Sequence, residues 1–163
     1  MKLKVLFLIL ISSVFTANSQ PPDLIVLPVR NNTIFFEIFG SAGYLYNVSY
    51  DRIIKSHGRS KFTMAIGTQI LPNDDFNKIN TVSITPQINF LYGIQHHLEI
   101  GTGYIYDFIS KEQGFSFRLG YRYQKRIGGF FFKAGFTPLL LKDVLSNKYS
   151  LSPWAGLAIG WSF

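Results

Sequence analysis

Apolar and polar residues alternate with a period of two along most of this chain, and turn residues interrupt the alternation again and again. In TVSITPQINFLY (81–92), every second residue from Val82 to Tyr92 is apolar, and the residues between them, up to Asn89, are Thr, Ser, Gln or Asn. No helical periodicity competes with this pattern. It predicts eight strands, at residues 33–39, 43–53, 61–70, 81–92, 97–106, 115–124, 130–138 and 151–163.

The alternation does not by itself say which face of a barrel points inward. A soluble, lipocalin-like barrel has its apolar face inside, whereas an outer-membrane barrel turns its apolar face toward lipid. The polar face of this chain is rich in small residues, which suits the narrow interior of a small barrel better than a solvated exterior. Its glycines are Gly67, Gly101, Gly103, Gly120, Gly135, Gly156 and Gly160.

Tyrosines favour the membrane interpretation. Eight of the nine lie on the apolar face, many near strand ends, where an aromatic girdle at the level of the lipid headgroups requires them. They are Tyr44, Tyr46, Tyr50, Tyr92, Tyr104, Tyr106, Tyr121 and Tyr123.

The last segment, LSPWAGLAIGWSF (151–163), points the same way. Leu157, Ile159, Trp161 and Phe163 alternate with small residues, and this pattern resembles the signal that outer-membrane assembly machinery reads. We therefore expect an all-β fold, an eight-stranded antiparallel transmembrane β-barrel over residues 33–163.

Composition excludes several other classes. The chain has 163 residues, 47% of them hydrophobic and 15% charged, against roughly 25% charged residues in soluble domains. Without cysteine, neither a disulfide framework nor a thiolate metal site is available. The formal charge is +7, but the basic residues are scattered and form no phosphate-binding stripe, so nucleic acid is not an expected partner.

The N-terminal stretch MKLKVLFLILISSVFTANSQ has the composition of a secretory signal peptide. Lys2 and Lys4 precede an apolar run that is too short for a membrane-spanning helix, and Ala17 and Ser19 are small residues suited to a cleavage site. No cysteine follows Ser19, which excludes a lipoprotein. We expect a signal peptide at 1–19, cleavage and export, then a periplasmic segment at 20–32.

Three stretches, FFEIFGSAGYLYNVSYDRI (35–53), GYRYQKRIGGFFFKAGFTPLL (120–140) and PWAGLAIGWSF (153–163), resemble small outer-membrane β-barrel proteins of the Bacteroidetes type. The resemblance covers nearly the whole chain after the signal peptide. It implies a barrel in the outer membrane of a Gram-negative envelope and carries no catalytic residue.

Connection lengths predict the topology, because outer-membrane barrels have short periplasmic turns and longer outer loops. The short connections are 93–97 and 125–129. The long ones, 71–80, 107–114 and 139–150, are expected to face outward, where they could meet lipopolysaccharide or a surface ligand. The tight stretch 40–43 leaves open whether 33–39 forms a separate first strand.

Chemistry-bearing residues are few. His96 and His97 lie beside Glu99, but neighbouring residues point to opposite faces of a strand, and a metal site needs three or four convergent ligands. A solvated turn is therefore the favoured interpretation of these histidines, and of His57. Lipid A-modifying barrels need a His and a Ser near the outer rim, and no such pair stands out. We expect no enzyme, no metal and no cofactor.

The polar face carries three acids and three bases that strand parity directs inward. Buried charges must be paired, so these side chains are expected to form a salt-bridged plug that fills the interior. The protein would then act through its outer loops, in surface interaction or envelope integrity. The alternative is a charged constriction in a narrow pore for small solutes. The six residues are Glu37, Asp51, Glu99, Arg118, Arg122 and Lys133.

Overall fold

The computed structural model describes residues 30–42, 46–71, 81–142 and 149–163. The expected signal peptide at 1–19 lies outside these ranges, as do Tyr44 and most of the expected periplasmic segment at 20–32. No helix in the described residues is long and apolar enough to cross a membrane.

The described elements are β-strands, apart from one short 3-10 helix. They are β1 (Asn32–Phe39), η1 (Gly40–Ala42), β2 (Tyr46–His57), β3 (Ser60–Leu71), β4 (Thr81–Gly93), β5 (His96–Asp107), β6 (Gln113–Gln124), β7 (Gly129–Phe136), β8 (Leu139–Lys142), β9 (Tyr149–Ser152) and β10 (Ala155–Ser162).

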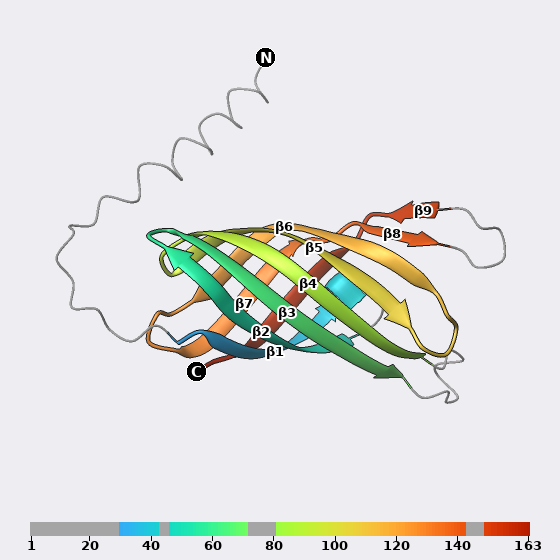
Figure 1. Ribbon diagram of the computed structural model, residues 1–163, viewed down its shortest axis with the longest axis horizontal. Helices are drawn as coiled ribbons and strands as arrows, with labels where there is room; N and C mark the ends of the chain where they lie inside the picture. Colours follow the sequence, from blue (N-terminus) through green and yellow to red (C-terminus); the bar gives the residue numbers. More distant parts are fainter. Residues whose placement is uncertain (1–29, 43–45, 72–80, 143–148) are drawn as a thin grey trace, which may run out of the picture.

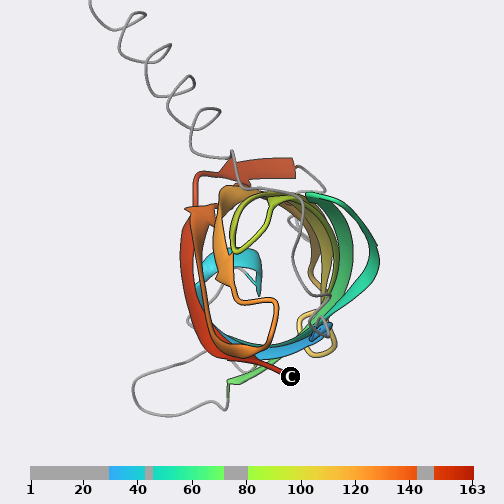
Figure 2. The ribbon, with the colours of Figure 1, turned by 90° about the vertical axis from the view of Figure 1, so that its left-hand side faces the viewer.

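Within the described residues, eight strands form a closed antiparallel barrel (Figure 1). From β1 to β7 each strand pairs with its neighbours in the chain, and β10 pairs with both β7 and β1. At the junction of β1 and β10, Asn32 and Phe163 exchange two backbone hydrogen bonds of 3.1 and 2.8 Å. The ring is plain when the barrel is viewed end-on (Figure 2).

A hairpin of β8 and β9 continues the wall beyond the barrel, at the upper right of Figure 1. β8 pairs with residues 113–116 of β6, and β9 pairs with β8. Pro138 separates β7 from β8 because it has no N–H for the ladder, although its carbonyl accepts a 3.0 Å hydrogen bond from the N–H of Phe117. The expectation of a loop over 139–150 was therefore wrong, since 139–142 and 149–150 are strand.

The other connections agree with the expected alternation of short and long. Turns at 58–59, 94–95 and 125–128 lie at one end, with Arg30 and Phe163, whereas η1 and the turn at 108–112 lie at the other. β1 is a separate first strand. The expected end of the second strand at residue 53 was wrong: a register shift between Ile53 and Lys55 breaks the alternation, and β2 continues to His57.

Burial along the eight barrel strands follows the expected parity up to the irregularity after Ile53 in β2, with mostly polar side chains inside and apolar ones outside. In β3, Lys61 and Thr63 are buried, whereas Phe62 and Met64 are half exposed. Many large apolar side chains of the other strands are equally exposed, and more polar and charged side chains than apolar ones are buried. The distribution is thus the reverse of that in a soluble β-barrel, where the apolar face is inside.

Glycines on the inner face let neighbouring strands bend close together. Gly120 of β6 pairs with Gly135 of β7, and a Cβ atom at Gly135 would lie 2.9 Å from the Cα of Gly120. Contacts this short would push the two strands apart, so both positions require the smallest residue.

We therefore expect Gly135→Leu to destabilise the barrel by about 1–3 kcal/mol through overpacking. Ala134→Leu is the matched control, because Ala134 is adjacent but on the outer face, where added volume meets no opposing wall. Urea unfolding followed by far-ultraviolet circular dichroism measures both changes. Equal losses at the two positions would contradict the assigned faces.

Candidate functional site

The interior of the barrel contains a network of charged side chains. Arg122 of β6 makes more of the contacts in this network than any other residue does. Arg122 Nη2 donates to Asp51 Oδ1 at 2.7 Å, and Nη1 donates to Asp51 Oδ2 at 3.2 Å. Nε and Nη2 also donate to Gln124 Oε1, at 3.1 and 2.8 Å. Nη1 lies 3.9 Å from Glu99 Oε1. One guanidinium group therefore joins β2, β5 and β6.

Glu37 of β1 forms a second centre of the network. Arg118 Nη2 donates to Glu37 Oε1, and Lys133 Nζ lies 3.9 Å from the same oxygen. Arg118 Nη2 also donates to Ser41 Oγ at 2.7 Å, and the N–H of Ser41 donates to Glu37 Oε2 at 3.4 Å. Because Ser41 belongs to η1, these bonds hold η1 inside the barrel, near β2, β3, β4, β5, β6 and β10 (Figure 2).

The structure thus places all six residues of the expected charge network in the interior and brings them together. None of the six is more than 5% exposed, and each takes part in an ion pair of 4 Å or less. Three carboxylates face three cations, so the charges of the set balance. Such an arrangement fills space and fixes the strands. The six are Glu37, Asp51, Glu99, Arg118, Arg122 and Lys133.

Two phenylalanines lie among these charges, and sequence reasoning missed them. Phe35 and Phe131 stack with their ring centroids 5.3 Å apart, and both are buried. Arg122 lies over the ring of Phe131 at 4.9 Å and Lys133 over the ring of Phe35 at 4.1 Å, in cation–π geometry. Both rings could have been predicted to point inward from the parity of their strands, because each occupies an inward position within an unbroken aromatic run.

A lysine–histidine contact was also missed. His97 is buried and shares the inner face with Glu99, so its expected place in a solvated turn was wrong; His96 is exposed on the outer face. Lys61 Nζ lies 2.6 Å from His97 Nε2 and donates to the carbonyl of Ile94 at 3.1 Å. In the described residues, no group of three or more His, Cys, Asp or Glu side chains could hold a metal ion.

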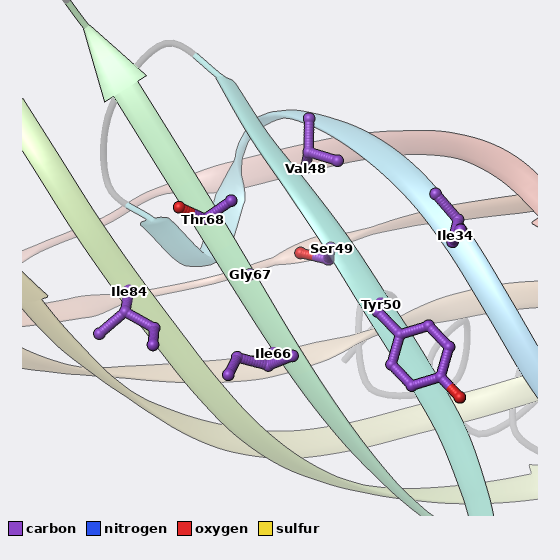
Figure 3. Close-up of a pocket in the computed structure, with 8 residues that line it drawn as sticks. All are labelled: Ile34, Val48, Ser49, Tyr50, Ile66, Gly67, Thr68 and Ile84. Carbon is purple, nitrogen blue, oxygen red and sulfur yellow. The ribbon is translucent and has the colours of Figure 1, made fainter.

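The outer wall has a shallow apolar groove of about 370 Å³ across β1 to β4 (Figure 3). Its only side-chain hydroxyls on the outer face belong to Tyr50 and Thr68, and both already donate hydrogen bonds, to Asn32 Oδ1 and to the carbonyl of Ser83. The groove therefore has no free side-chain donor on its outer face, and its largely apolar lining suits hydrocarbon. It is lined by Ile34, Val48, Ser49, Tyr50, Ile66, Gly67, Thr68 and Ile84.

The residues of the expected assembly signal all lie on the outer face of the last strand. Leu157, Ile159 and Trp161 of β10 are 57–61% exposed, and Phe163 follows them at 46%. Their alternation continues the apolar outer wall of the barrel up to its junction with β1.

No family model, no curated protein and no solved structure matches this chain. The resemblance to Bacteroidetes-type barrels stays a prediction.

Removal of the central cation tests the network. Arg122→Met would leave Asp51 with a single 2.9 Å hydrogen bond from Thr63. It would also remove the 3.9 Å ion pair of Glu99, whose carboxylate oxygens accept no hydrogen bond in the protein, so two buried carboxylates would lose the charge of Arg122. We expect a loss of unfolding free energy of about 3–5 kcal/mol.

Lys125→Met is the matched control, because Lys125 is exposed in the 125–128 turn and should change stability by less than about 0.5 kcal/mol. Adding Asp51→Asn and Glu99→Gln to Arg122→Met should restore part of the loss. Urea titrations compare the variants, and a loss that the neutral partners do not reduce would contradict charge pairing as the cause.

Proposed function

We propose that this protein is a transmembrane β-barrel of the bacterial outer membrane whose interior is closed by its own side chains. It acts without catalysis, through the connections at its outer end, in surface interaction or envelope integrity. The resemblance noted in the sequence agrees with this proposal.

The reversed burial is the observation that carries the proposal. Outward positions of successive strands, such as Phe62, Ile88 and Phe117, expose large apolar side chains over the barrel wall. A wall of this kind favours contact with lipid, because monomeric soluble proteins rarely expose large continuous apolar patches. Most of the barrel strands have 12 or 13 residues, which is enough for the roughly 9–11 residues that a tilted strand needs to cross a bilayer.

Orientation follows from the connections. Outer-membrane barrels have short periplasmic turns, so the turns at 58–59, 94–95 and 125–128 would face the periplasm. The hairpin of β8 and β9 and the 108–112 turn would then face outward. Phe108 and Leu151, 49% and 67% exposed, offer apolar contacts there to lipopolysaccharide or to a surface ligand. The loop expected at 71–80 lies outside the described residues, apart from Leu71.

Assembly would depend on the last strand. Leu157, Ile159, Trp161 and Phe163 form its apolar outer face, the side that outer-membrane assembly machinery would meet during insertion.

A charge on the outer wall tests the membrane assignment. Phe117 pairs with Thr102 in the middle of β5, so Phe117→Arg would place a cation near the bilayer midplane, at an expected cost of about 2–4 kcal/mol. Phe108→Arg, in a turn at the rim, is the matched control and should cost at most about 1 kcal/mol. Folding titrations in lipid vesicles give both values. Equal tolerance of the two arginines would count against a lipid-facing wall.

A narrow pore is the second candidate, because some buried polar atoms of the interior, among them Arg118 Nε and both Glu99 carboxylate oxygens, have no hydrogen-bond partner in the protein. Such atoms favour water in the interior. The ion pairs and η1 oppose free passage, so we expect the purified protein to be electrically silent in planar bilayers. A stable, reproducible single-channel conductance would contradict the closed interior and favour the narrow pore.

A further inference from the structure

Basic side chains gather at the barrel end that carries the three short turns. Arg30, Arg52, Lys55, Lys125 and Arg126 all lie there, and all are exposed. We call these five residues the basic rim.

Acidic side chains are distributed in the opposite way. Of those in the described residues, Glu37, Asp51 and Glu99 are buried in the interior. The other two, Asp107 and Glu112, flank the 108–112 turn at the far end. The basic rim therefore has no exposed Asp or Glu side chain beside it within the described part of the chain.

The fold brings three members of the basic rim together. The N–H of Arg30 donates to the carbonyl of Arg126 at 2.9 Å, which fixes the start of β1 against the 125–128 turn. A Cβ atom at Gly128 would lie 2.9 Å from Cγ of Arg30, so the arginine stem crosses this glycine closely. Arg30, Lys125 and Arg126 thus form a concentrated positive charge, which an anion from outside the chain would stabilise.

The basic rim also borders the apolar wall. Arg52 lies on the outer face of β2, two residues after Tyr50 and opposite Met64, which is 53% exposed. Ile127, 59% exposed, follows Arg126 directly. Long basic side chains at such a border keep their stems on apolar surface and their charges in the headgroup layer.

We propose that the basic rim binds the phosphate groups of anionic phospholipid headgroups in the leaflet that surrounds the short turns. This inference rests on the proposed function, because only a membrane-embedded barrel would hold the basic rim at headgroup level. A lipid fits better than a soluble anion because the cations follow the edge of the apolar wall. There one lipid molecule could place its headgroup against the cations and its acyl chains against the wall. The basic rim thereby fixes the depth of the barrel in its membrane.

The test measures lipid binding to the full folded protein in nonionic detergent micelles. Native mass spectrometry determines dissociation constants for phosphatidylglycerol and phosphatidylcholine of identical acyl chains. One cation near an anionic surface strengthens binding about fivefold, so Lys125→Gln/Arg126→Gln should reduce the preference for phosphatidylglycerol by about tenfold or more. Lys111→Gln/Lys142→Gln, with the same charge change at the other end, should leave that preference unchanged.

Competition identifies the ligand. Inorganic phosphate and a polyglutamate peptide, each at the same anion concentration as the lipid, should fail to displace phosphatidylglycerol. Displacement by phosphate would make a free anion the ligand, and displacement by the peptide would make it an acidic protein; either overturns the inference. So would equal affinity of the unaltered protein for the two lipids, or an unchanged preference in Lys125→Gln/Arg126→Gln. A protein that stays folded and monomeric without detergent would instead refute the membrane barrel itself.

Discussion

Charge compensation around Arg122 is the constraint on which the barrel interior depends. Its guanidinium is fully buried and reaches one carboxylate on β5, the neighbour of β6, and another on β2, which does not pair with β6 and lies 71 positions away in sequence. A slip of one residue in any of these strands would move the charged set to the outer wall and bring aromatic rings inside. The ion pairs therefore act on register as well as on stability, because a strand shifted by one residue would turn its charged side chain away from its partner.

Space for this network comes from residues that have almost no side chain. An eight-stranded barrel is only wide enough for side chains to fill it, so every large group requires a small one across from it. Gly160 pairs with both Phe35 and Phe131, and the stacked rings occupy the room that it leaves. The rings in turn give Arg122 and Lys133 polarisable faces to lie against. Aromatic, cationic and glycine positions are thus parts of one packing solution.

Period-two alternation predicted the strands and sorted their residues into two faces, because both depend on local geometry. Which face points inward needed further signals, namely the small residues of the polar face, the tyrosines of the apolar face and the last strand. The alternation did not reveal which inward residues meet. The contact of Ser41 with Arg118 joins positions 77 apart, and the Lys61–His97 contact joins positions 36 apart. It also failed where the ladder is irregular. After Ile53 an extra residue shifts the pattern while β2 continues, and at Pro138 a missing N–H separates β7 from β8.

The junction of β1 with β10 affects the order in which the barrel folds. The hydroxyls of Thr33 and Ser162 meet across it at 2.8 Å, although 129 positions separate them in the chain. Local hairpins can form early, but this last ladder must wait until both ends of the domain have been made and have found each other, which makes closure slow. Until then β1 and β10 are open edges with apolar side chains, ready to pair with another chain. A newly made molecule is therefore most vulnerable to aggregation just before its final seam closes.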